Sequence, residues 1–224
     1  MKKIKQILLY LAAVILLTIG LTLIFNEPIQ NMIVSHNTET VRTAITRDQI
    51  QKNMETKNDD YDFSKVKSLD INQVGQALTH NQTQVIGLIA IPSVSLNLPI
   101  SKGLSDAALS AGGGTMRENQ KMGVGNYPLA GHYMTSKGLL FSPLESVEIG
   151  ELIYLTDLDK IYIYKIYQKE VVDPYAVWLA DNTSNSIVTL ITCADGGVNR
   201  WAIRGELIET KNATNPELAV FNLK

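Results

Sequence analysis

The chain has 224 residues, of which 45% are hydrophobic, and 20 basic against 22 acidic side chains give a formal net charge of −2. This length can bury one substantial core, and the charge balance lacks the basic excess that nucleic-acid binding requires. The only cysteine is Cys193, so an intramolecular disulfide is excluded. The sequence therefore predicts a single folded domain without a nucleic-acid partner.

The N-terminus has a basic start followed by an apolar segment. Lys2, Lys3 and Lys5 precede an uncharged run over residues 7–25, which approaches the ~20 residues needed to cross a bilayer. A cleaved signal peptide also begins this way, but its apolar core is usually only ~7–15 residues long and ends at a small-residue cleavage site. Residues 26–30 offer no such site. Residues 1–25 are therefore predicted to form an uncleaved transmembrane anchor, with the lysines in the cytoplasm and the rest outside.

Residues 26–60 are mostly polar, with scattered apolar positions. Part of this segment can be helical, and we interpret it as an extracellular stem that separates the folded domain from the membrane. The sequence does not distinguish a rigid stem from a flexible one.

Residues 61–210 consist mainly of short β-branched and aromatic runs separated by Pro, Gly, Asp and Asn, a composition typical of strands. This pattern predicts a barrel or a sandwich, followed by a C-terminal tail over residues 211–224. Short helices are expected at residues 105–111, with Ser105 as the cap, and near residues 143–147. The expected strands include residues 85–91, 152–155, 161–167, 187–193 and 200–207.

Two features only superficially resemble ligand sites. Residues 112–115 read Gly-Gly-Gly-Thr but lack the Lys-Ser/Thr sequel of a phosphate-binding loop, and are predicted to form a turn. Asp157 and Asp159 lack the ligand spacing and the terminal Glu of an EF-hand. Neither feature predicts a cofactor or a metal.

Cys193 ends an apolar, β-branched run and precedes a polar, Gly-containing loop over residues 194–199. Free cysteine is most often a small buried hydrophobe. A thiol at a strand end next to a loop, however, lies where a rigid sheet commonly presents catalytic groups. The oxidising exterior favours disulfides, so a lone thiol there is a hint that the thiol is used.

A cysteine nucleophile needs a proton partner, and the chain has three histidines. His36 and His80 lie in polar surroundings and are expected to be solvated. His132 follows Gly131 at the end of an apolar step, where glycine permits an unusual turn and close approach of another element. Arg200 begins the strand after the loop that follows Cys193, so its charge can lie across that loop from the thiol.

These residues together resemble the catalytic signature of the class A sortases. The resemblance rests on Leu-Ala-Gly-His at residues 129–132, Thr-Leu-Ile-Thr-Cys at 189–193, and Arg200 shortly before Gly-Glu-Leu at 205–207, and it covers roughly residues 61–210. It implies an all-β, eight-stranded antiparallel β-barrel with short helices. It also implies a cysteine transpeptidase that cleaves Leu-Pro-X-Thr-Gly sorting signals between Thr and Gly and joins the new carboxyl end to an amine of a lipid II-type cell-wall precursor.

The resemblance assigns three catalytic roles. Cys193 is the nucleophile that forms a thioester, His132 is the general acid and base, and Arg200 donates hydrogen bonds to the substrate or the oxyanion. Which protonation state of the Cys–His pair is active stays open, because interacting groups titrate as a pair.

The resemblance also implies an apolar groove for the Leu-Pro part of the signal, with the loop at residues 172–186 as one wall. Trp178 is equally compatible with a packing role in that loop. The candidate substrate contacts are Ala130, Ile191, Thr192, Val177, Trp178 and Leu179.

Some members of the family are activated by calcium held by acidic residues ahead of the catalytic histidine. Residues 117–124 here offer one carboxylate, from Glu118, against the two cations Arg117 and Lys121, so no calcium is expected. Two other functions remain open: an extracellular cysteine peptidase that only hydrolyses, and a non-catalytic anchored binding module in which Cys193 belongs to the core.

Overall fold

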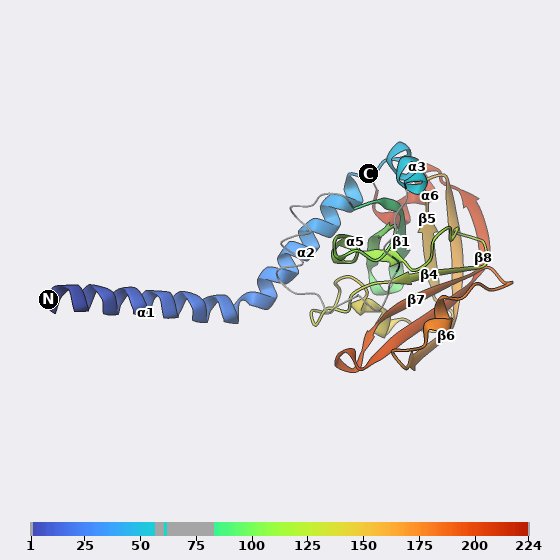
Figure 1. Cartoon of the computed structure of the whole chain (residues 1–224). Coiled ribbons are helices and arrows are strands. Elements are labelled where there is room, and N and C mark those ends of the chain that lie inside the picture. Colours follow the sequence, from blue (N-terminus) through green and yellow to red (C-terminus); the bar gives the residue numbers. More distant parts are fainter. Residues whose placement is uncertain (1, 57–60, 62–82, 224) are drawn as a thin grey trace.

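The computed structural model describes residues 2–56, 61 and 83–223 (Figure 1). Residues 57–60 and 62–82, where the sequence analysis places the end of the stem and the beginning of the domain, lie outside the described residues. The helices are α1 (Lys2–Ile24), α2 (Asn26–Thr43), α3 (Arg47–Glu55), α5 (Asp106–Ala111) and α6 (Asn215–Leu218), with short 3-10 turns η2 (Pro92–Val94), η3 (Ser142–Ser146), η4 (Val177–Ala180), η5 (Asp195–Gly197) and η6 (Ala219–Phe221). The strands are β1 (Val85–Ile91), β2 (Leu96–Ser101), β3 (Gly113–Thr115), β4 (Asn126–Ala130), β5 (Leu152–Thr156), β6 (Lys160–Val172), β7 (Ile187–Ala194) and β8 (Asn199–Asn212).

The eight strands close into a barrel in the order β1-β2-β3-β4-β7-β8-β6-β5, which confirms the predicted eight-stranded barrel. Neighbouring strands are antiparallel except in two pairs, β2–β3 and β4–β7, which are parallel. Parallel neighbours need a crossover connection. Helix α5 provides it between β2 and β3, and the segment containing β5 and β6 provides it between β4 and β7.

Strand β1 has the predicted bounds because its β-branched run ends at Pro92, which begins η2. Both faces of β1 are buried. Ile89 and Ile91 point into the main core inside the barrel, whereas Leu88 and Ala90 belong to a second cluster with residues of α3 and the C-terminal segment. Because each face of β1 packs in a different cluster, its sequence is apolar at every position and does not alternate.

Residues 112–115 do not form the predicted turn, since Gly113–Thr115 are strand β3. A Cβ atom at Gly112 would lie 2.2 Å from the carbonyl oxygen of Pro99, and one at Gly114 would lie 2.3 Å from that of Gly103. The backbone therefore approaches its neighbours too closely for side chains. A strand of this kind has no alternating side-chain pattern, which is why the sequence conceals it.

Helix α1 extends away from the barrel (Figure 1), and none of its apolar segment is buried. Among the described residues it is the one helix long and apolar enough to cross a membrane, over Lys3–Leu21. A signal sequence near the N-terminus meets the same criterion. The helix thus has the length and composition of the predicted anchor.

Helices α2 and α3, which come from the segment interpreted as a stem, pack against the barrel (Figure 1). Val34 of α2 is buried in the main core, and Ile50 of α3 is buried in the second cluster. The guanidinium of Arg42, also buried, donates to the carbonyl oxygen of Phe221 at 2.6 Å. Residues 26–55 are therefore part of the folded domain.

Candidate active site

Cys193 lies near the end of β7, directly opposite Arg200 of β8 in the strand register. Residues opposite one another on adjacent strands project from the same face of the sheet, and so does Ile191, two positions before Cys193. The alternate residues Val188 and Leu190 belong to the main core. Cys193 and Arg200 therefore face the outside of the barrel.

Two hydrogen bonds, one between backbone groups and one from a side chain, hold the segment leading to His132 against β7. The amide of Gly131 donates to the carbonyl oxygen of Ile191 at 3.1 Å, and Thr192 Oγ1 donates to the carbonyl oxygen of Gly131 at 2.8 Å. A Cβ atom at Gly131 would lie 2.6 Å from the ring of Phe141, so only glycine fits. These contacts bring His132 to the end of β7 where Cys193 lies.

Cys193 and His132 line one cavity of about 620 Å³, which we call the polar cavity. Cys193 is a free, half-buried thiol. His132 is 5% exposed, and its Nε2 atom has no hydrogen-bond partner among the described residues. The remaining lining residues are Tyr133, Met134, Thr135, Glu145, Ala194, Asp195, Gly196, Gly197 and Trp201 from the barrel and its loops, and Glu27, Gln30 and Asn31 from α2.

Burial lowers the pKa of His132 to about 4 from its ordinary value of 6.5, against a smaller opposing effect of the charge on Asp106. The imidazole is therefore neutral at pH 7, and a neutral imidazole has one nitrogen that accepts a proton.

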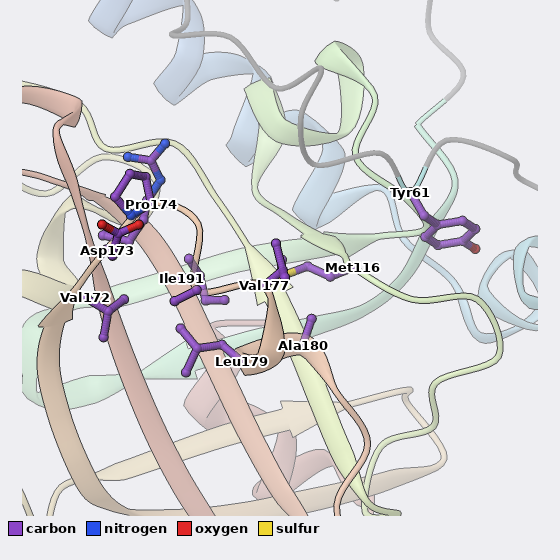
Figure 2. Close-up of a pocket in the computed structure, with 11 residues that line it drawn as sticks. Tyr61, Met116, Val172, Asp173, Pro174, Val177, Leu179, Ala180 and Ile191 are labelled. Atoms are coloured by element: carbon purple, nitrogen blue, oxygen red, sulfur yellow. The ribbon is translucent and has the colours of Figure 1, made fainter.

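Arg200 lines a second, apolar cavity of about 320 Å³. Its Nη1 atom donates to the carbonyl oxygens of Gly197 and Asn199 at 2.8 and 2.9 Å. Its Nε atom is buried and has no partner in the described part of the chain. Figure 2 shows Val177, Leu179 and Ala180 of η4 next to Ile191 of β7, with Met116 beside them and Val172, Asp173 and Pro174 towards one end.

Three of the six predicted groove residues line the apolar cavity, namely Val177, Leu179 and Ile191. Trp178 does not line it, since its side chain is half-exposed and its ring lies 5.1 Å from the guanidinium carbon of Arg204. Ala130 is buried in a small cluster around Leu104. Thr192 is buried and acts on the site through its hydrogen bond to Gly131.

Sequence reasoning missed several lining residues. Met116 lies outside the loop at residues 172–186 that was expected to form the groove wall. Glu27, Gln30 and Asn31 belong to a segment without any motif, and only the docking of α2 brings them to the polar cavity. Of the other histidines, His36 is exposed on α2, and His80 lies outside the described residues.

Within the described part of the chain, no group of three or more His, Cys, Asp or Glu side chains could hold a metal ion. In the segment considered for calcium, Arg117 donates to the carbonyl oxygen of Asn126 at 2.6 Å. Its cationic head therefore lies against the barrel, where β4 begins.

Comparisons with known proteins agree with this architecture. The sortase domain model matches residues 89–208. Sortase A of Streptococcus agalactiae is 42% identical over 211 residues, which are 90% of this chain and 85% of that protein. Sortase A of Listeria monocytogenes is 41% identical over 207 residues, or 90% of this chain and 92% of that protein.

Solved structures give the same result. The crystal structure of the Listeria monocytogenes sortase A has a TM-score of 0.60 at 43% identity and covers 62% of this chain and 99% of that one. Sortase C-3 of Streptococcus pneumoniae has a TM-score of 0.59 at 19% identity, covering 84% of this chain and 96% of that one, which is a likeness of fold alone.

A closed barrel with a cysteine and a histidine in one surface cavity has the architecture of the sortases, and the chain belongs to that family. Its relatives, which are 41–42% identical over 90% of the chain, identify it as a class A sortase. The protein is accordingly a cysteine transpeptidase.

Proposed function

We propose that this transpeptidase cleaves Leu-Pro-X-Thr-Gly sorting signals between Thr and Gly and joins the Thr carboxyl to an amine of a lipid II-type cell-wall precursor. The observation that carries the proposal is the single cavity lined by both Cys193 and His132. Because the chain has one cysteine, the nucleophile of a cysteine transpeptidase in this chain has to be Cys193.

In the first half-reaction, Cys193 Sγ attacks the Thr carbonyl carbon and the bond to the Gly nitrogen breaks. His132 takes the thiol proton and gives it to the departing Gly amine. Its imidazole is neutral at pH 7, and its Nε2 atom has no partner among the described residues, so a nitrogen is available for that proton.

In the second half-reaction, the acceptor amine attacks the thioester carbon and the bond to sulfur breaks. The proton that the amine loses passes to His132 and from there to the departing Cys193 thiolate. Both groups thereby return to their starting protonation states, and the cycle is balanced.

Arg200 is assigned the stabilisation of the tetrahedral oxyanion or of the bound substrate. A guanidinium carries its charge throughout the working pH range. Its position opposite Cys193 favours this role, since an oxyanion donor must come within about 3 Å of the oxygen that it stabilises. On binding substrate, Arg200 would exchange its carbonyl partners in the loop for the substrate oxygen.

The apolar cavity is assigned to the Leu and Pro side chains of the signal. Val177 and Leu179 from η4 and Ile191 from β7 give it aliphatic walls, which favour apolar groups by burial. Ala130 and Thr192 are assigned supporting roles, Ala130 through its packing with Leu104 and Thr192 through its hydrogen bond to Gly131. Trp178 is not assigned to this cavity, because it is not among the lining residues and its ring packs against Arg204.

We also propose that α1 anchors the enzyme in the cell membrane, with the N-terminal lysines in the cytoplasm and the barrel outside. The apolar length of α1 and the positive charge ahead of it support this orientation. An external protease added to intact cells should then degrade the barrel and leave the N-terminus protected.

The test of the proposed function is to incubate the full chain in detergent with a Leu-Pro-X-Thr-Gly peptide, with and without a glycine peptide as acceptor. The full chain is used because α2 and α3 contribute to the core. A transpeptidase gives a ligated product when the amine is added. A peptidase gives only the free acid in both reactions, and a binding module leaves the peptide intact.

A further inference from the structure

The polar cavity carries negative charge that the mechanism does not use. Glu27, Glu145 and Asp195 line it, and no Lys or Arg is among its described lining residues. The nearby cation Lys169 donates to the backbone carbonyl oxygens of Glu145 and Val147 and lies over the ring of Trp201. None of these contacts is made to a carboxylate of the cavity.

Two of the three carboxylates are oriented by neutral donors that leave their charge in place. Tyr133 donates its hydroxyl to Glu145 Oε2 at 2.6 Å, and Asn199 Nδ2 donates to Asp195 Oδ2 at 2.7 Å. Oriented carboxylates around a cavity create a potential that attracts a cation.

Unpartnered polar atoms of two residues that line the same cavity point independently to a polar ligand. The His132 side chain is 5% exposed, and its Nε2 atom has no hydrogen-bond partner among the described residues. Asn31 Oδ1 is also buried without a partner in the described part of the chain. Buried polar atoms normally find a partner, so a ligand with N–H groups would complete this cavity.

The position of α2 indicates the side from which a ligand enters. Helix α1 ends at Ile24 and α2 begins at Asn26, so Glu27 and Asn31 lie in its first turns, ~2 to ~8 Å along the axis from Asn26. The cavity wall is thus next to the helix that is assigned to the membrane. A ligand held at the membrane surface would reach this cavity directly.

We propose that the polar cavity is the acceptor subsite, in which Glu27, Glu145 and Asp195 bind the ammonium form of a primary amine. This proposal rests on the proposed function. Each cavity then binds one of the two substrates, and the two cavities meet at Cys193 and Arg200. The acyl donor occupies the apolar cavity, and the acceptor occupies the polar cavity and approaches from the side of α1.

Only the neutral amine can attack the thioester, so the carboxylates take no part in the chemical step. They act by raising the concentration of the acceptor in the cavity. The bound ammonium loses one proton to water and then attacks as described above. Glu27, Glu145 and Asp195 are therefore positioning residues for the acceptor, whereas Cys193 and His132 carry the chemistry.

The test uses the full chain with Glu27→Gln, Glu145→Gln and Asp195→Asn, singly and combined, and a glycine peptide as acceptor. The amides keep shape and hydrogen-bond acceptors but remove charge, and Asn tolerates the positive φ of 51° at position 195. Since one exposed ion pair contributes a factor of only about 2 to 3, the triple variant should raise the KM for the amine about 10-fold. The cleavage rate without amine should fall by less than this factor.

Two controls test whether the change in KM depends on the carboxylates of the cavity and on the charge of the acceptor. Glu55→Gln removes an exposed carboxylate on α3 outside both cavities and should leave the amine KM at the wild-type value. Hydroxylamine is largely uncharged at neutral pH, so its KM should be nearly the same in the triple variant and the wild type. Thermal unfolding of each variant verifies that α2 remains docked.

An unchanged KM for the glycine peptide in a folded triple variant would overturn the acceptor subsite. An equal rise in KM for hydroxylamine would overturn it too, because charge recognition would not be the cause. Failure of the wild type to cleave the Leu-Pro-X-Thr-Gly peptide at all would instead contradict the proposed function, so the two failures are distinguishable.

Discussion

Cys193 and Arg200 lie directly opposite each other on β7 and β8, yet each lines a different cavity. The thiol belongs to the polar cavity with His132, and the guanidinium belongs to the apolar cavity with Ile191. The pair therefore marks the boundary at which the acyl group of a substrate in the apolar cavity meets the nucleophile.

The two arginines of β8 should differ strongly in their effect on catalysis. Arg200 and Arg204 are roughly 13 Å apart along the strand at ~3.3 Å per residue, and only Arg200 lies opposite Cys193. We expect Arg200→Ala to lower kcat/KM at least ~100-fold, the scale for losing an oxyanion donor. Arg204 packs over the Trp178 ring, so Arg204→Ala should cost far less. Similar losses in steady-state assays of both variants would contradict the assignment.

The buried His132 should make stability depend on pH in a defined window. Its pKa is about 4 in the folded protein and 6.5 in the unfolded chain, so the unfolded chain binds the proton first as the pH falls. Stability is complete above pH 6.5 and decreases towards pH 4, by about 3 kcal/mol for this one group.

Chemical denaturation of wild type and His132→Gln between pH 7 and pH 4 checks this prediction. Other titratable groups affect the free energy of unfolding of both proteins. The informative quantity is therefore the difference between the wild type and His132→Gln in how this free energy changes with pH. His36→Gln, which alters an exposed residue of α2, is the matched control and should follow the wild type. A His132→Gln profile parallel to that of the wild type would show that the imidazole is not held neutral by burial.

Helix α3 should contribute to global stability, as a part of the folded domain does. Ile50 is 1% exposed in the cluster with Leu88 and Phe221, so Ile50→Ala should lower the free energy of unfolding by about 2 to 5 kcal/mol. Met54 lies on the same helix and is 46% exposed, and Met54→Ala should change it little. Equal and small effects of both substitutions in urea denaturation would indicate that α3 is only a linker.

Activity should not depend on calcium. A hard divalent cation needs several oxygen ligands, whereas residues 117–124 provide one carboxylate, from Glu118, next to the cations Arg117 and Lys121. We expect peptide cleavage at the same rate in calcium and in excess chelator. A several-fold loss of rate on chelation, restored by adding calcium back, would disprove this expectation.

The parts of the fold that were predictable are those in which local sequence decides the structure. The run at residues 85–91 ends at a proline and becomes β1, and the Ser105 hydroxyl accepts from the Ala108 amide and caps α5 as expected. The β-branched run ending at Cys193 becomes β7. In each case the residue types indicate the local conformation, and for the two strands pairing with neighbouring strands completes it.

The parts that escaped prediction depend on contacts between distant residues. Strand β3 exists because glycines allow close backbone approach, and its sequence resembles a turn. Helix α2 is held in place by hydrogen bonds from Arg42 to carbonyl oxygens near the C-terminus. The sequence of α2 itself does not indicate this contact. For the same reason, the contribution of Glu27 and Asn31 to the polar cavity was not visible in the sequence.

The central claim is that Cys193 forms the thioester, and intact-mass spectrometry of the full chain after brief incubation with a Leu-Pro-X-Thr-Gly peptide tests it most directly. Cys193→Ala removes the sulfur from a half-buried strand end, so it should keep the fold and lose cleavage. Cys193→Ser should be nearly inactive too, because an alcohol is far less acidic than a thiol. We predict that the wild type gains the mass of the Leu-Pro-X-Thr acyl group, located at Cys193 by peptide mapping, and that Cys193→Ala gains none. Cleavage by Cys193→Ala at near the wild-type rate, or an acyl group on another residue, would contradict the account.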